Sequence, residues 1–213
     1  MQTLIPLREP EPAAEHAPSW HAFLELGFRP LYLAGASWAL LAVLIWVFAP
    51  QLVAGPLAGL AWHAHEMLWG FVATIAVGFL LTAGANWTGI TPLAGAPLAA
   101  LLALWLLARI GYLVPAMPAF WLAVAAEAIF FAVVALALAR VVWRTRNRRN
   151  YAAPLMLLAL GLAHLLFIAW LDDWLLARRG FQAGLLVMAM IALLVARRVI
   201  PFFAMRAVPG LQI

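Results

Sequence analysis

Two histidines, a glutamate and a methionine lie within the stretch WHAHEMLWGF, residues 62–71. They are His63, His65, Glu66 and Met67, and these residue types bind metal ions or move protons. The surrounding sequence is apolar enough for a membrane span, where an ionisable side chain is costly and usually has a function. The chain has no cysteine, which excludes thiolate-bound metals and iron–sulfur clusters and makes imidazole the first candidate ligand.

The composition indicates an integral membrane protein. Of 213 residues, 68% are hydrophobic and only 10% are charged, so too few polar side chains exist to cover the surface of a soluble domain. The net charge of +5 does not indicate a nucleic-acid binder, because all 13 basic residues are arginines and several lie together in residues 140–149. We therefore expect membrane lipids, and no nucleic acid, as partners.

Six apolar segments are long enough to cross a bilayer, which takes about 20 helical residues. Prolines and glycines lie between them, where a missing amide proton does least harm. The predicted fold is all-α, a polytopic bundle of six transmembrane helices over residues 28–205, with a flexible or interfacial tail at 1–27 and a C-terminal tail at 206–213. The predicted spans are residues 30–48, 57–85, 97–114, 118–139, 154–171 and 181–203.

The arginines predict the orientation. Short loops rich in basic residues stay on the cytoplasmic side, so the loop at residues 140–149 is expected there. Counting spans in both directions then places both termini in the cytoplasm.

On a regular helix successive residues turn by about 100°, so His63 and His65 lie about 200° apart and cannot both bind one ion. His63 is expected to share a face with Glu66, Met67 and the small residues that follow, which is typical of a face turned toward a bundle interior. His65 is expected on the other side with Trp69. The pattern indicates two sites, or one metal ligand and one group that positions a ligand or handles protons.

Four predicted helices place ionisable side chains at a common depth. At about 1.5 Å per residue, His65 and Glu127 each lie roughly 13 Å from the turn before their span. His164 lies roughly 12 Å, and Arg109 roughly 9 Å, from the turn that follows. All four belong to the half of the bundle away from the basic loop, as a cofactor held between helices requires.

Several cofactors are compatible with these residues. His65 and His164 are candidate axial ligands of a haem, with Arg109 as a partner for a propionate. Met67, one turn after His63, is a soft ligand suited to copper. The metal candidates are His63, His65, Met67 and His164, with Glu66 and Glu127 as groups that position ligands or handle protons.

Two simpler interpretations stay open. His164 is also compatible with a hydrogen-bonded packing role. Arg109 and Glu127, on consecutive antiparallel spans, are also compatible with an ion pair that makes both tolerable in lipid. In that case the polar groups stabilise the bundle and bind no metal.

Longer motifs resemble the NnrS family of membrane proteins. The resemblance covers nearly the whole chain, and the Trp-His-Ala-His-Glu-Met and Asn-Trp-Thr-Gly elements are the most specific. The motifs are GFRPLYLAGASWALLAV at residues 27–43, WHAHEMLWGF at 62–71, GFLLTAGANWTG at 78–89, NRRNY at 147–151 and RRVIPFFAMRAVPG at 197–210. Matching positions without an assigned role are Arg29, Asn86, Arg198 and Pro201.

The resemblance implies a bacterial inner-membrane protein that contains b-type haem, with copper as a second metal, linked to denitrification and to tolerance of nitric oxide and nitrosative stress. It points first to His63 and His65 as metal ligands, with Glu66 beside them. Typical members are longer, and this chain resembles only their first half. A second copy or a partner subunit is expected to complete the site if ligands are missing.

Three functions stay open. The first is a protein that binds or turns over nitric oxide or a related nitrogen oxide at an intramembrane metal, as an enzyme or as a binding protein. The second is a cytochrome b-like subunit that exchanges electrons with quinol. The third is a non-enzymatic subunit or transporter in which His63, Glu66, Arg109 and Glu127 form a proton relay or a salt-bridge network.

Overall fold

The computed structural model describes residues 19–208, except the side chains of Arg198 and Phe202, and all regular structure in that range is helical. Six helical segments are long and apolar enough to cross a membrane, so the prediction of an all-α fold with six spans is confirmed. The α-helices are α1 (Trp20–Phe23), α2 (Phe28–Phe48), α3 (Gly59–His65), α4 (Ala73–Thr88), α5 (Ala96–Leu113), α6 (Met117–Arg144), α7 (Ala152–Ala169) and α8 (Trp174–Ala207). Short 3-10 helices lie at η1 (Pro50–Leu52) and η3 (Arg148–Asn150), and η2 (Glu66–Val72) is a π-helix.

The ends of the helices follow local signals that the span prediction did not use. Helix α8 begins at Trp174, earlier than predicted, because the carboxylate of Asp173 accepts hydrogen bonds from the backbone amides of Leu175 and Leu176 at 2.9 and 3.3 Å. Helix α4 ends at Thr88 and is followed by Gly89, whose φ of 69° is the left-handed conformation that favours glycine after a helix.

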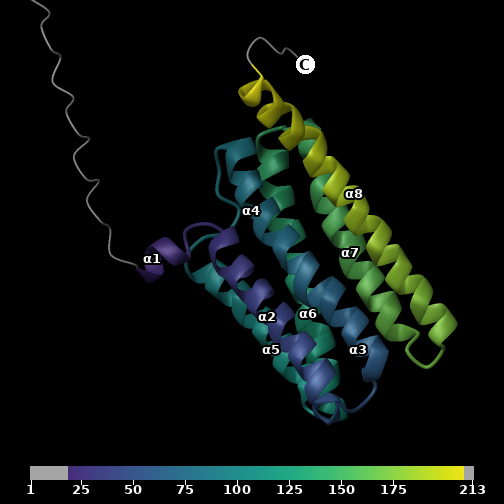
Figure 1. The fold of residues 1–213 in the computed structure, drawn as a ribbon. Coiled ribbons are helices and arrows are strands. Elements are labelled where there is room, and N and C mark those ends of the chain that lie inside the picture. The colour runs from purple at the N-terminus through teal and green to yellow at the C-terminus, as the bar shows by residue number, and fades with distance from the viewer. Residues whose placement is uncertain (1–18, 209–213) are drawn as a thin grey trace, which may run out of the picture.

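The segment α3–η2–α4, residues Gly59–Thr88, is the central span of the bundle (Figure 1). In its most apolar window 61% of the residues are buried inside the protein, against 22% for α2 and 18% for α8. Helix α2 packs on one side of this span and α6 on the other, while α5 packs on α6, and α7 lies between α6 and α8. Both sides of the central span therefore face protein.

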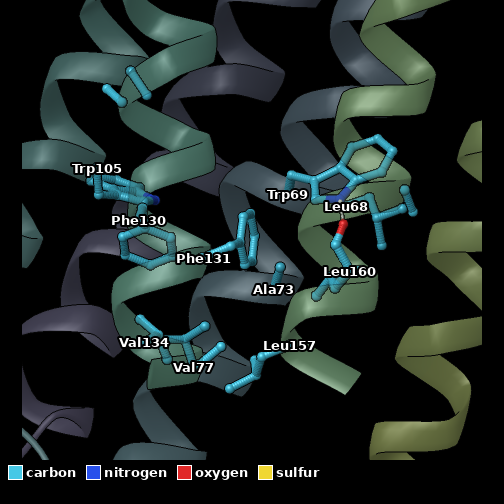
Figure 2. Close-up of a cluster of buried hydrophobic side chains, with 14 of the residues drawn as sticks. Leu68, Trp69, Ala73, Val77, Trp105, Phe130, Phe131, Val134, Leu157 and Leu160 are labelled. Atoms are coloured by element: carbon cyan, nitrogen blue, oxygen red, sulfur yellow. Dashed lines mark hydrogen bonds between the residues drawn. The ribbon is translucent and has the colours of Figure 1, made fainter. Parts of the chain in front are cut away.

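Large aromatic side chains fill the core beside this span (Figure 2). The indole nitrogen of Trp69, on η2, donates a hydrogen bond to the backbone oxygen of Leu160 on α7 at 3.1 Å. Helix α7 approaches α6 closely at Gly161, where an added Cβ would lie 2.8 Å from Cβ of Phe131. These contacts fix η2, α6 and α7 relative to one another, and all three supply residues of the site described next.

The predicted tails lie partly outside the described residues. Residues 1–18 and 209–213 are not among them. Within the predicted N-terminal tail, residues 19–27 contain α1, and the backbone oxygen of Leu24 accepts a hydrogen bond from the amide of Gly95 at 2.8 Å. The guanidinium of Arg29 donates to the backbone oxygen of Ala22 and lies 3.1 Å from the carboxylate of Glu25, so this residue ties α1 to α2.

Candidate metal centre

Five ionisable side chains from four spans meet inside the bundle. They are His65 at the end of α3, Glu66 at the start of η2, Arg109 on α5, Glu127 on α6 and His164 on α7, and each is at most 2% exposed. On α5, α6 and α7 they lie nearer the helix ends opposite the basic loop at residues 144–149. The predicted common depth is confirmed, because these side chains touch one another.

Three side-chain nitrogens lie within hydrogen-bonding distance of the carboxylate of Glu66. Nη1 of Arg109 and the indole nitrogen of Trp38 each lie 2.5 Å from Oε2 of Glu66. Nδ1 of His65 lies 2.9 Å from Oε1. A buried carboxylate with this many partners is tolerated as a charged group. Glu66 therefore orients Arg109 and His65 toward the next carboxylate.

Glu127 is that second carboxylate, and its Oε2 contacts three side chains. Nη2 of Arg109 lies 2.5 Å away, Nε2 of His65 lies 3.3 Å away and Nε2 of His164 lies 3.4 Å away. Oε2 of Glu127 is therefore paired by charge with Arg109 and lies within reach of both imidazoles, although these contacts are not aligned as ideal hydrogen bonds.

His65, Glu127 and His164 together form a candidate donor set for a metal ion. One ligand atom from each of the three residues lies within 4.8 Å of the others. Ligands about 2.0 Å from a tetrahedral ion are about 3.3 Å from each other. The carboxylate oxygen lies 3.3 and 3.4 Å from the two imidazoles, and the imidazole nitrogens lie within 4.8 Å of each other. Two imidazoles and one carboxylate suit copper, zinc and non-haem iron.

The formal charges also favour a cation. Glu66 and Glu127 contribute two negative charges and Arg109 one positive charge, so one negative charge is uncompensated while both imidazoles are neutral. An unbalanced charge is costly at this burial. One further positive charge, either a proton on an imidazole or a metal ion between the imidazoles, would balance the cluster.

A haem between His65 and His164 does not fit the arrangement. Their ring centroids lie 5.1 Å apart, and Trp69 packs 5.4 and 5.6 Å from them. The ring centroid of Tyr112 lies 4.8 Å from that of His65. These side chains occupy the space that a porphyrin would need, so the residues present fit a single ion and do not fit the macrocycle.

The π-helix η2 and Gly70 shape the site. An added Cβ at Gly70 would collide with Oε2 of Glu66 and with Nη1 of Arg109. One turn further on, the hydroxyl of Thr74 donates to the backbone oxygen of Gly70 at 2.9 Å and accepts from the indole of Trp105 at 2.8 Å. π-Helical turns are rare and are found mostly at functional sites.

The prediction that His63 shares an interior face with Glu66 is wrong. His65, and not His63, lies with Glu66 in the interior, while the ring of His63 stacks on Trp46 of α2 with centroids 3.9 Å apart. The physical reason is that the central span is covered by protein on both sides, so the face opposite the small-residue stripe is also interior. His65 does share that face with Trp69, as predicted.

The other residues that the sequence analysis singled out lie in different parts of the structure. His63 is half-buried, with Nδ1 unpartnered among the described residues, and Met67 packs against the hydrophobic core. Arg109 forms the ion pair with Glu127 that its position suggested. Asn86 lines a cleft between α2, α4 and α8, and Pro201 lies inside α8. The side chain of Arg198 is outside the described set.

Two partners of the site were not predicted. The hydroxyl of Tyr112 lies 3.2 Å from Nε2 of His164, and Trp38 contacts Glu66. Tyr112 follows Arg109 by three residues and so shares its helix face, which was a usable signal. The sequence contains no such signal for Trp38, because a tryptophan inside an apolar span is usually a packing residue.

A family model described as NnrS protein matches residues 22–213, a range that includes all six spans and all five buried ionisable residues. No curated protein and no solved structure matches the chain.

Proposed function

Because the chain belongs to the NnrS family, we propose that it is a membrane protein of the nitric oxide response that binds a copper ion through His65, Glu127 and His164. The observation that carries this proposal is the approach of three buried ligand atoms, from His65, Glu127 and His164, to within 4.8 Å of one another. When bound, copper supplies a site that coordinates nitric oxide or a related nitrogen oxide and exchanges one electron with it.

The remaining side chains hold these ligands in place. Glu66 fixes the ring of His65 through Nδ1, and Arg109 links Glu66 to Glu127. Such contacts from outside the ligand set orient imidazoles and carboxylates. Tyr112 places a hydroxyl beside His164, where it is available to a ligand of the ion.

The position of the site suits a small neutral gas. Nitric oxide dissolves in lipid, and a buried site among apolar helices is reached without a polar channel. We further propose the orientation in which both termini lie in the cytoplasm of a bacterium and the site lies in the periplasmic half of its inner membrane, because the arginine-rich loop at residues 144–149 is at the opposite end of the bundle.

Metal analysis of the full chain tests the proposal. The protein is produced with ample copper, iron and haem, and bound metals are measured per chain. Glu127→Gln, which keeps the size of the side chain, should lower bound copper severalfold, because an amide is a weaker ligand than a carboxylate. Glu25→Gln, at an exposed carboxylate paired with Arg29, should leave it unchanged.

The results that would contradict the proposed copper site can be told apart from those that would only change the identity of the metal. Equal copper in both variants, or no transition metal in the unaltered protein, would contradict the site. Iron bound in place of copper, and lost with Glu127→Gln, would keep the residues and replace the metal. A Soret band from the same sample tests the haem expectation, for which these imidazoles offer no room as they lie.

A second candidate function is a metal-free ion network that handles protons. It is favoured by Arg109, which already gives Glu127 a cationic partner at 2.5 Å. The same metal analysis separates the two functions, because the network alone binds no copper.

A further inference from the structure

The hydroxyl of Tyr112 lies at the candidate metal centre beside the three donor residues. It is 3.2 Å from Nε2 of His164, and the side chain is buried, with 2% of the residue exposed. The centroid of the phenol ring lies 4.8 Å from that of the His65 ring. A phenol oxygen accepts hydrogen bonds and, after loss of its proton, is an anionic oxygen donor for a metal ion. Tyr112 is therefore a further candidate ligand.

Close packing of α5 on α6 holds this hydroxyl in place. At Gly111 an added Cβ would lie 2.8 Å from Cβ of Ala123, so no side chain separates the two helices there. Ala123 lies about one turn before Glu127 on α6. The ring of Tyr112 also packs against that of Phe120, with centroids 6.0 Å apart. The phenol is thus fixed beside the cluster by contacts that do not depend on a metal ion.

The distances within the cluster are compatible with a fourth ligand. Nε2 of His164 lies 3.2 Å from the phenol oxygen and 3.4 Å from Oε2 of Glu127. That carboxylate oxygen lies 3.3 Å from Nε2 of His65. Ligands about 2.0 Å from a tetrahedral ion are about 3.3 Å from each other. The contact between Tyr112 and His164 is therefore as close to that spacing as the contacts of the carboxylate are.

The charges of the cluster leave room for one more anion when the ion is divalent. Glu66, Glu127 and Arg109 together carry one negative charge, so a cupric ion between neutral imidazoles leaves one positive charge in excess. An uncompensated charge is costly at this burial. The phenolate of Tyr112 would cancel it, and its proton leaves to the medium as the ion enters, since metal binding releases protons from ligands.

We propose that Tyr112 is the fourth ligand of the metal centre and binds the oxidised, cupric ion through its phenol oxygen. The inference rests on the proposed function, because it needs the ion that His65, Glu127 and His164 would hold. Metal sites with four ligands can expand to five. A nitrogen oxide therefore still has a place at the ion, within reach of the phenol oxygen.

Optical and resonance Raman spectra of the full chain in detergent test the proposal. The protein is loaded with copper and oxidised with ferricyanide, and bound copper is measured per chain. A phenolate bound to a cupric ion gives a visible charge-transfer band, and excitation in this band enhances the vibrations of the phenolate ring. The unaltered protein should show both the band and the ring vibrations. Tyr112→Phe should lose both while the remaining ligands still bind copper.

The other two of the three tyrosines in the chain are matched controls. Tyr32 packs against Phe28, and Tyr151 packs against Trp143, both outside the cluster. Tyr32→Phe and Tyr151→Phe should therefore keep the band. The amount of bound copper would not decide alone, because removal of a residue that only positions His164 also lowers metal affinity, by about 10- to 100-fold. The band decides, because a tyrosine that only hydrogen-bonds to His164 does not produce it.

Failure of this inference and failure of the proposed function give different results. Bound copper without phenolate vibrations, or with vibrations that persist in Tyr112→Phe, would overturn the ligand and leave the copper site standing. No bound transition metal would contradict both. If Tyr112→Phe does not accumulate, Tyr32→Phe with Tyr151→Phe leaves Tyr112 as the single tyrosine. Ring-deuterated tyrosine should then shift the vibrations, and an unchanged spectrum would overturn the proposal.

Discussion

Nη2 of Arg109 lies 2.5 Å from Oε2 of Glu127, and both side chains are at most 2% exposed. The other terminal nitrogen, Nη1, lies 2.5 Å from Oε2 of Glu66. One guanidinium thus joins the two buried carboxylates of the bundle, and each of them also contacts His65. The planar fork of arginine, which is always charged, makes this double contact possible.

Removal of this guanidinium should destabilise the protein strongly. Arg109→Gln leaves two buried carboxylates without their shared cation, and breaking a buried pair in this way costs about 3–5 kcal/mol. We expect a lower midpoint of thermal unfolding in detergent and a lower yield in membranes. Arg178→Gln, at an exposed position, is the control and should have little effect. Equal midpoints for the two variants would show that Arg109 is not the cation that holds the cluster.

Gly70 should not tolerate even one added carbon. Gly70→Ala places a Cβ against Glu66 and Arg109, both fixed by their own partners, so the site must shift or the bundle must loosen. We expect reduced copper binding and a lower unfolding midpoint. Gly35→Ala is the comparison, because the nearest atoms to its Cβ are the flexible end of Ile75 at 3.2 Å and the methyl group of Thr74 at 3.4 Å, both ordinary or slightly tight contacts. A Gly70→Ala protein as stable and as rich in copper as this control would contradict the close packing at the site.

The indole of Trp38 should contribute through its nitrogen. Trp38→Phe removes the donor 2.5 Å from Oε2 of Glu66, and a hydrogen bond to a charged group contributes about 1.5–3 kcal/mol. The free energy of unfolding in mixed micelles measures the loss. Trp121→Phe, at a side chain 54% exposed on α6, makes the same substitution without the buried carboxylate. A loss no greater than that of Trp121→Phe would show that the indole nitrogen does not matter.

Much of the fold could be predicted from the sequence, because long apolar runs and prolines mark spans directly. The depth of the site was also predictable, since rise per residue places Arg109, Glu127 and His164 level with His65. Which of the two histidines lies with Glu66 in the interior was not predictable. That depends on which neighbours cover the central span, and on the π-helix at Glu66–Val72, whose turn departs from 100° per residue.

The contacts between individual side chains could not be predicted from the sequence either. Trp38 and Glu66 are far apart along the chain, and only the packing of α2 on the central span brings them together. Trp46 and His63 meet for the same reason. Apolar patterns specify which segments cross the membrane but not which polar atoms they bring into contact.

The copper content of His65→Ala and His63→Ala tests the central claim most directly. Both variants remove one imidazole from the same short stretch, and both are purified as the full chain after growth with copper. We predict that His65→Ala loses most of the bound copper, while His63→Ala, whose ring stacks on Trp46 outside the cluster, keeps it. Loss of copper from His63→Ala, with copper retained by His65→Ala, would contradict the assignment of the metal to His65, Glu127 and His164.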